Sequence, residues 1–207
     1  MKILTVNGSP RKNNTSGLLL SELEKLMPRH IERKNLYVQN STDFSPQDQD
    51  VTVLAFPLYV DGLPSQLLSF LVSGGAGKIF AEGTSVYCII NCGFYEASHS
   101  RVASSIIQNC CMRTGAEYMG CLRIGSGGGI VGALKRDSLG FPARKISREL
   151  SFLAYAIINR RKYDTEVSAD YPRFIYKAGA DIAWRIQAAK NGVSLHEMPD
   201  FTDHGIV

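Results

Sequence analysis

Short apolar segments alternate with helix-forming segments along most of this chain, and the alternation restricts the folds that it can adopt. Most of the apolar segments are β-branched and nearly free of charge, which is typical of strands in a sheet covered on both faces. Strands that alternate with helices form a parallel sheet with helices on both sides. The predicted strands span residues 2–6, 31–38, 51–56, 85–91 and 117–124, and the segment 31–38, which is more polar than the others, is expected near an edge of the sheet.

Helical periodicity predicts the elements between these strands. The first helix follows the loop that ends near residue 17 and stops at Pro28, and the second begins at Pro64. A third helix is predicted to turn Val102, Ile106, Ile107 and Cys110 toward the sheet. With right-handed crossovers, five strands separated in this way favour the spatial order 2-1-3-4-5. Two more helices, over about 142–159 and 173–190, follow the last strand and are joined by the polar segment 160–170.

Length and composition predict one soluble domain. The 207 residues, of which 44% are hydrophobic and 20% charged, predict a single domain over 1–207, with about 139–192 as an additional C-terminal helical region. No segment has the roughly 18 apolar residues of a membrane-spanning helix, and the first apolar run is too short for a secretory signal. We therefore expect a cytoplasmic location and no membrane partner.

Charge and cysteine spacing argue against two further classes of protein. The net charge of +4 comes from scattered residues, so no nucleic-acid partner is expected. The five cysteines lack the short, regular spacing of a metal site, and no metal is expected.

Ligands of an open parallel sheet bind beyond the carboxyl ends of its strands, where the strand order reverses. In the order 2-1-3-4-5 this point lies between the first and third strands. The loops after strands one, three and four are therefore the candidates for a binding site.

The loop after the first strand reads GSPRKNNTSG, from Gly8 to Gly17. The start of a helix offers unpaired backbone N–H groups and a partial positive charge, which together stabilise a phosphate. The loop adds hydroxyl, amide and cationic side chains, and it lacks the GK and Ser or Thr of a nucleoside-triphosphate loop. Composition alone leaves two interpretations equally open: a phosphate cradle, or a polar turn in which Thr15 or Ser16 caps the helix.

The loops after the third and fourth strands suit a flat ring. The first, PLYVDGLPSQ, carries Tyr59 as an aromatic platform and Gly62, which permits a close backbone approach. The second, NCGFYEASHS, has Gly93, which allows an irregular backbone whose N–H groups would face ring carbonyl oxygens. Nothing near Cys92 predicts a lowered pKa, so we interpret it as a packing residue. No side chain in these loops is predicted to act as an acid or a base.

A glycine pattern follows the fifth strand. Gly127, Gly129 and Gly132 spell G-x-G-x-x-G, which binds dinucleotides when it leads directly into a helix. Here Gly140 and Pro142 interrupt the segment that follows. We interpret the pattern as part of a loop that lines the ligand side of the sheet.

The stretches NGSPRKNNTSGLL, FPLYVDGLPSQLLSFL and NCGFYEA, in this order over residues 1–124, resemble the NADPH-dependent FMN reductase family of flavodoxin-like flavoproteins. The resemblance implies an α/β, flavodoxin-like three-layer sandwich with a five-stranded parallel sheet of order 2-1-3-4-5 and extra C-terminal helices. In that family the first loop binds the FMN phosphate and the other two hold the isoalloxazine ring. Carried over to this chain, the cofactor-binding residues are Ser9, Arg11, Asn14, Thr15, Ser16, Pro57, Leu58, Tyr59, Val60, Gly62, Asn91, Cys92, Gly93 and Phe94.

Two features depart from that family. The related iron–sulfur flavoproteins carry a cysteine cluster between the second and third strands, where this chain has no cysteine, so no iron–sulfur centre is expected. The family also usually ends with one helix after the fifth strand, whereas residues 139–192 contain two and include Trp184. Three roles stay open for these helices: a dimer interface, a cover over the site, or packing against the sheet.

The resemblance implies an FMN-dependent NAD(P)H oxidoreductase. Such an enzyme uses NADPH or NADH to reduce a small acceptor through bound FMN: a quinone, an azo or nitro compound, or a flavin. The resemblance also implies a homodimer. The alternative is a flavodoxin-type electron carrier that serves protein partners, and the net positive charge argues against it because such carriers usually present acidic surfaces.

Overall fold

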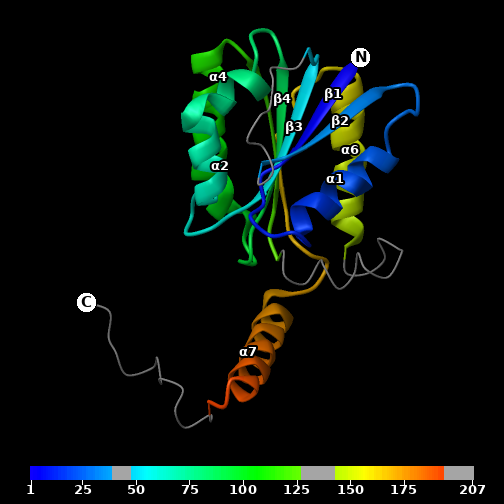
Figure 1. The fold of residues 1–207 in the computed structure, drawn as a ribbon. Coiled ribbons are helices and arrows are strands. Elements are labelled where there is room, and N and C mark those ends of the chain that lie inside the picture. The colour runs from blue at the N-terminus through cyan, green and yellow to red at the C-terminus, as the bar shows by residue number, and fades with distance from the viewer. Residues whose placement is uncertain (39–47, 127–142, 194–207) are drawn as a thin grey trace. The chain divides into compact units, whose positions relative to one another are not determined.

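The structure, a computed structural model, describes residues 1–38, 48–126 and 143–193. The chain divides into two compact units, Met1–Asp170 and Tyr171–Val207, and each is described by itself. The first unit contains a sheet with helices on both faces (Figure 1). The expectation of one domain over 1–207 stays a prediction. The glycine pattern at 127–132 lies outside the described residues.

Six parallel strands form the sheet of the first unit, in the order β2-β1-β3-β4-β5-β6. The predicted order 2-1-3-4-5 is confirmed, and one strand is added to the five that were predicted. This sixth strand lies inside the segment 160–170, so the prediction of a simple polar connection there is wrong. The strands are β1 (Lys2–Asn7), β2 (Glu32–Tyr37), β3 (Val51–Pro57), β4 (Ser85–Asn91), β5 (Glu117–Ile124) and β6 (Thr165–Val167).

Helices cover both faces of the sheet and complete the three expected layers. In Figure 1, α1 and α6 lie on one side of the strands, and α2 and α4 lie on the other. Two short elements adjoin these helices: a kinked turn, η2, which separates α2 from α3 and in which Gly74 has φ +98°, and a 3₁₀ turn, η3, which precedes α4. Their bounds are α1 (Thr15–Lys25), α2 (Ser65–Phe70), η2 (Leu71–Gly75), α3 (Ala76–Ile79), η3 (Ala97–Ser100), α4 (Arg101–Thr114) and α6 (Arg144–Ile158).

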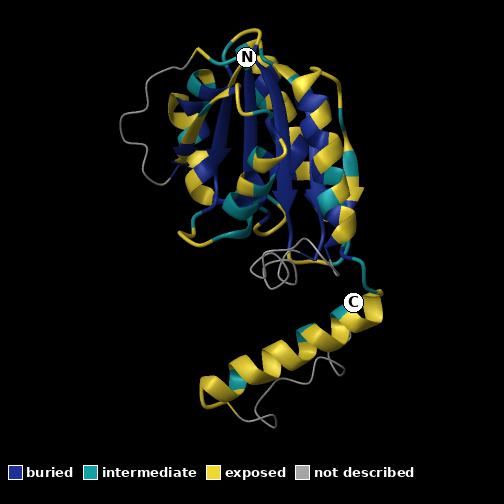
Figure 2. Cartoon of the chain, turned by 90° about the vertical axis from the view of Figure 1, so that its right-hand side faces the viewer, coloured by how far each residue is buried: buried dark blue, intermediate teal, exposed yellow. Residues whose placement is uncertain are grey.

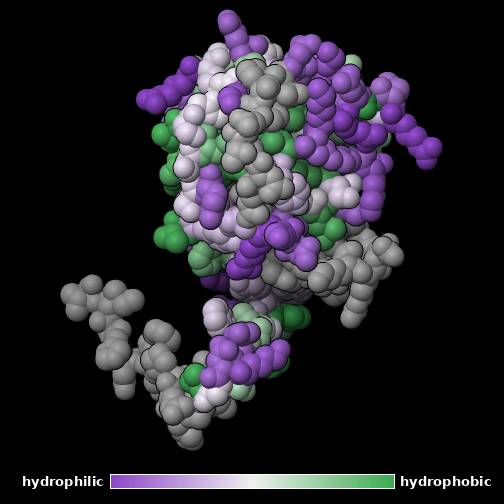
Figure 3. Space-filling model, viewed as in Figure 1, coloured by the Kyte–Doolittle hydropathy of each residue, from purple (hydrophilic) through white to green (hydrophobic). Residues whose placement is uncertain are grey.

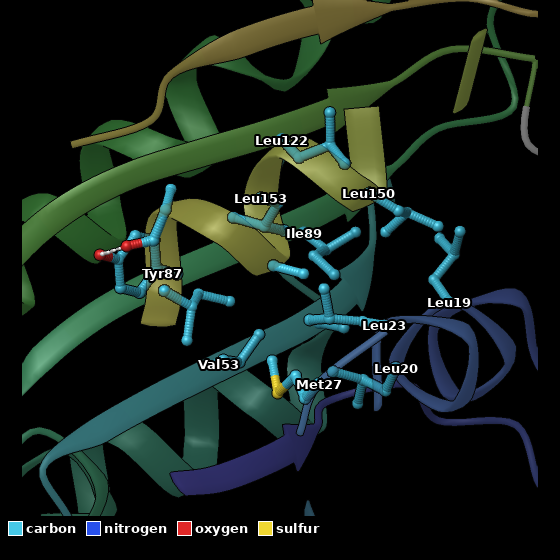
Figure 4. Packing of buried hydrophobic residues seen from close by; sticks show 14 of the residues in the cluster. Leu19, Leu20, Leu23, Met27, Val53, Tyr87, Ile89, Leu122, Leu150 and Leu153 are labelled. Carbon is cyan, nitrogen blue, oxygen red and sulfur yellow. Dashed lines mark hydrogen bonds between the residues drawn. The ribbon is translucent and has the colours of Figure 1, made fainter. Parts of the chain in front are cut away.

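The core consists of two apolar clusters, one on each face of the sheet. β4 is buried along its whole length, and β3 is buried from Val51 to Phe56. The cluster between the sheet and α1 and α6 includes Leu23, Ile89 and Leu153, which point toward one another in Figure 4. Burial of a leucine or isoleucine side chain contributes about 1.5–3 kcal/mol. These two clusters therefore hold the central strands and the four large helices together.

Tyr87 ties the central strand β4 to the end of α6. It is fully buried, and its hydroxyl donates to the carbonyl oxygens of Ala156 and Arg161 at 3.1 and 2.9 Å. Burial raises the pKa of Tyr87 to about 12, so the hydroxyl keeps its proton and remains a donor.

The polar character of β2 agrees with its place at the edge of the sheet. Four of its six residues are exposed, and Figure 3 shows hydrophilic side chains gathered on this side of the molecule. On α4, Ile107 is buried as expected, but Val102 is 63% exposed. The inner face of α4 runs through Ala103, Ile107 and Cys111, one residue away from the predicted register.

The second unit contains one described helix, α7 (Arg173–Lys190), as predicted over 173–190. None of its residues is buried, and Figure 2 shows α7 exposed along its length. Trp184 is 68% exposed. Among the described residues, no helix combines the length and the apolar character needed to cross a bilayer.

A β-bulge at Gly120 lets the edge of the sheet close against the segment before β6. Val86 pairs with Tyr118 and Tyr87 with Gly120, so β5 carries one extra residue here. Gly120 has φ +120°, and a Cβ built on it would overlap the carbonyl oxygen of Tyr163. Only glycine fits both the backbone conformation and the close approach.

We predict that Gly120→Ala lowers the free energy of unfolding by about 3 kcal/mol, because it combines backbone strain with a backbone collision. Gly77→Ala is the matched control, since a Cβ at the helical Gly77 meets nothing within 4 Å and alanine favours a helix. Guanidinium unfolding monitored by circular dichroism measures both. Equal stability of the two variants would contradict the role assigned to the bulge.

Candidate functional site

A cleft of about 850 Å³ lies at the carboxyl ends of β1, β3 and β4, beside the start of α1. This volume falls within the roughly 300–1,000 Å³ typical of cofactor and small-molecule sites. Its described lining contains no carboxylate and two cations. The lining residues are Ser9, Arg11, Lys12, Asn13, Asn14, Thr15, Ser16, Gly17, Leu18, Ser21, Tyr37, Pro57, Leu58, Tyr59, Asn91, Cys92 and Gly93.

Side-chain hydrogen bonds at its two ends shape the first loop. Asn7, the last residue of β1, accepts from the backbone N–H of Ser9 at 3.0 Å and donates to Asn14 Oδ1 at 3.2 Å. Asn14 is the N-cap of α1, because the same Oδ1 accepts from the backbone N–H of Gly17 at 2.7 Å. Its Nδ2 donates to the carbonyl of Arg11. The cap is therefore Asn14, rather than Thr15 or Ser16.

Several backbone donors of this loop lack an acceptor within the described part of the chain. They are the N–H groups of Lys12, Asn13, Asn14, Thr15 and Ser16, at the positive end of the α1 dipole. Arg11 and Lys12 are exposed beside them. This arrangement of amide donors and cations attracts a phosphate.

Ser16 connects the first loop of the cleft, residues 9–17, which we call the cradle, to the central strand β4. It is fully buried, and its hydroxyl donates to Asn91 Oδ1 at 2.8 Å. The hydroxyl is therefore engaged with β4, and Ser16 offers the cleft its backbone N–H. Ser9 is 2% exposed, and its Oγ accepts from the backbone N–H of Arg11 at 3.3 Å. The buried hydroxyl groups of both serines thus hold the loop in place through hydrogen bonds.

Three residues that the sequence did not single out help to build the cleft. A Cβ on Gly17 would lie 2.7 Å from Asn7 Nδ2 and 2.9 Å from the Tyr37 hydroxyl, so glycine lets both side chains reach the start of α1. Tyr37, the last residue of β2, forms a wall of the cleft. For Asn7 and Tyr37 the signal available in the sequence was their position at strand ends, which parallel topology brings to one edge.

The second loop forms a tight reverse turn. Tyr59 and Gly62 exchange backbone hydrogen bonds at 3.1 and 3.0 Å, and the two residues between them have positive φ angles: +49° for Val60 and +55° for Asp61. Pro57, Leu58 and Tyr59 line the cleft, whereas Val60 and Gly62 are not among its lining residues. Val60 is fully exposed at the tip of the turn.

The third loop contributes Asn91, Cys92 and Gly93 to the cleft. Phe94 is not in the lining; its ring lies against that of His99, with centroids 4.5 Å apart. His99 Nδ1 also lies 3.9 Å from the carboxylate of Asp61. The second and third loops therefore approach each other at Asp61 and His99, on the rim of the cleft, a contact that the sequence did not predict.

All five cysteines are free thiols held in protonated form. Burial raises the pKa of each: Cys88, Cys92, Cys110, Cys111 and Cys121. Cys92 Sγ lies 3.6 Å from the carbonyl oxygens of Phe94 and Glu96, as a donor inside its own turn. These contacts agree with a packing role for Cys92. Among the described residues, no cluster of three His, Cys, Asp or Glu side chains could hold a metal ion.

Comparisons of the whole chain identify its fold. No protein-family model matches the chain, and no curated protein matches it in sequence. It is similar to solved flavodoxins of Streptococcus pneumonia TIGR4 and of Fusobacterium nucleatum, the latter bound to flavin mononucleotide. Each is 14% identical with a TM-score of 0.55; the matches cover 77% and 78% of this chain and 99% and 100% of those chains.

A third similar structure is an NADH:FMN oxidoreductase (EMOB) in its apo form. It is 12% identical, with a TM-score of 0.53, over 75% of this chain and 89% of that chain. At these identities the likeness shows the flavodoxin-like fold.

We predict that Asn14→Ala lowers the free energy of unfolding by about 1–2 kcal/mol, because the helix loses its cap and Asn7 loses a partner. Asn109→Ala, on the exposed face of α4, is the control and should change stability by less than about 0.5 kcal/mol. Urea unfolding measures both variants. A wild-type midpoint for Asn14→Ala would mean that the cap does not order the loop.

We predict that Val60→Asn raises the free energy of unfolding by about 1 kcal/mol, because a β-branched residue is strained at φ +49° and asparagine tolerates that conformation. Val102→Asn is the control, since Val102 is also exposed but lies in α4 with ordinary helical geometry. Thermal unfolding followed by circular dichroism compares them. A loss of stability in Val60→Asn would show that the side chain has a packing partner.

Proposed function

We propose that this chain is an FMN-dependent NAD(P)H oxidoreductase that reduces a small acceptor such as a quinone, an azo or nitro compound, or a flavin. The observation that carries the proposal is the phosphate cradle of residues 9–17: five backbone N–H groups without an acceptor among the described residues, two cations and no carboxylate in the described lining. When bound, FMN supplies the redox chemistry, accepting a hydride from NADPH or NADH and passing electrons to the acceptor.

The residues at the cleft fit this cofactor. The backbone N–H groups of Thr15 and Ser16, with Arg11, would hold the phosphate at the start of α1. Pro57, Leu58 and Tyr59 would contact the ring from the second loop, and Asn91, Cys92 and Gly93 from the third. Val60, Gly62 and Phe94 belong to the rim and would influence the approach of a second substrate.

Two features support an enzyme over a carrier. The exposed cations of the cleft, Arg11 and Lys12, attract the phosphates of a nicotinamide dinucleotide. The similar NADH:FMN oxidoreductase performs this class of reaction on the same fold. We include a homodimer in the proposal, and light scattering after gel filtration tests it.

The second candidate is an electron carrier, because most of the similar structures are flavodoxins. A carrier would use the same cradle but present the ring to a protein partner. The two candidates differ in one property, direct reduction by NADPH or NADH.

We predict that the purified chain binds FMN at least tenfold more tightly than riboflavin, because riboflavin lacks the phosphate. Asn14→Asp keeps the acceptor for Gly17, loses the donor to the Arg11 carbonyl and adds a negative charge to the loop, so it should weaken FMN binding at least tenfold and riboflavin binding much less. Quenching of flavin fluorescence measures the dissociation constants of FMN and of riboflavin for the wild type and for the variant. Asn109→Asp adds the same charge on α4 and is the control. If the wild type bound FMN and riboflavin with equal affinity, the first loop would not be a phosphate-binding site.

Reduction without oxygen separates the enzyme from the carrier. The absorbance of protein-bound FMN near its visible maximum should disappear when NADPH or NADH is added under nitrogen, and should return when a quinone follows. An FMN-loaded protein that only dithionite reduces would support the carrier and contradict the oxidoreductase.

A further inference from the structure

The third loop of the cleft is held by three successive backbone carbonyls. The carbonyl oxygen of Phe94 accepts from the backbone N–H of Ser126, that of Tyr95 accepts from the Ser168 hydroxyl at 2.6 Å, and that of Glu96 lies 3.6 Å from Cys92 Sγ. These contacts determine the path of the backbone directly after Gly93, which lines the cleft.

Two of these three contacts come from the ends of β5 and β6. Ser126 lies two residues beyond β5, and Ser168 is the first residue beyond β6. Gly125 also packs directly against the loop, since a Cβ on it would overlap the carbonyl of Tyr95 and lie 3.0 Å from Ala97 N. The backbone N–H of Gly125 donates to Val167 at 2.8 Å, which joins the two strand ends beneath the loop.

Charged side chains hold β6 in the sheet. The strand is three residues long and pairs with β5 at only three positions, so its backbone bonds are few. Arg123 of β5 is 7% exposed and directly opposite Glu166 of β6, with Nε 3.1 Å from Oε1. The same guanidinium donates twice to Asp164, at 2.9 and 2.6 Å.

Arg101 at the start of α4 completes this network. It donates twice to Glu166, at 2.6 and 3.0 Å. The charges balance, two cations against two carboxylates, and the arginines hold the pKa of Asp164 and of Glu166 below the ordinary values. Because Asp164 also pairs with Arg123, loss of the Glu166 charge leaves no unpaired buried cation. The contact between β6 and the sheet can therefore be weakened without unfolding the protein.

We infer that β6 and this four-charge network form a strut that positions the third loop of the cleft, with Ser168 as the residue that transmits the position of β6 to the Tyr95 carbonyl. Glu166 and Ser168 are positioning residues: neither lines the cleft, and both act on Gly93 through the loop backbone. The inference deepens the proposed function, on which its cofactor-binding consequence rests.

The test measures amide hydrogen exchange of residues 92–97 in the protein without flavin. Ser168→Ala and Glu166→Gln should each speed exchange there about fivefold, as the loss of one hydrogen bond of ordinary strength implies. If Glu166 acts through Ser168, the double variant should exchange no faster than Ser168→Ala alone.

Matched controls alter similar contacts elsewhere. Ser151→Ala removes a serine hydroxyl that bonds within α6, and Asp50→Asn removes the ion pair with Arg160 at the opposite end of the strands. Both should leave exchange at 92–97 unchanged. Unchanged exchange in Ser168→Ala, or additive effects in the double variant, would overturn the inference.

Flavin binding gives the second readout. With FMN, Ser168→Ala and Glu166→Gln should shift the visible absorption bands of the bound flavin and raise its dissociation constant about fivefold, and the two controls should do neither. If the wild type binds no FMN, the proposed function fails, and the exchange experiment alone decides whether the strut positions the loop.

Discussion

Burial of the two central strands is the constraint on which the rest of this structure depends. Because β3 is buried from Val51 to Phe56 and β4 throughout, apolar helices must cover both faces, and each strand must pair on both sides. Parallel pairing then brings the carboxyl ends of β1, β3 and β4 to one edge. Polar loop residues collect there, beyond the last buried residues of these strands. The cleft is thus a consequence of how the core is built.

The cradle is ordered by short-range polar contacts. Asn7 ends a buried strand, yet both atoms of its amide are used, one for the turn at Ser9 and the other for the helix cap at Asn14. Ser16 adds the contact to Asn91 that joins the cradle to the third loop. Removal of one of these side chains therefore disturbs several backbone donors together. The loop is organised by the protein itself, and a bound anion need not order it.

The sequence predicted those helices and strands that can be recognised from the residues of their own segment. The strands at 85–91 and 117–124 coincide with β4 and β5, and the polarity of residues 31–38 placed β2 at an edge. β6 was missed because three residues carry no periodicity, and its partners, such as Arg123, lie far away in sequence. Eleven of the fourteen predicted site residues line the cleft, since they lie at or beyond the carboxyl ends of β1, β3 and β4 or at the start of α1. Val60, Gly62 and Phe94 do not, because a reverse turn and the contact with His99 direct them to the rim.

The protonated thiols have a consequence for the chemistry that the cleft can tolerate. Quinones and related electrophiles alkylate thiolates far faster than thiols, and Cys92 stands in the wall that such a compound would touch. Burial raises the pKa of Cys92 and leaves the residue 2% exposed, which favours the less nucleophilic thiol over the thiolate. Under the proposed function, a quinone bound in the cleft would therefore meet a buried thiol.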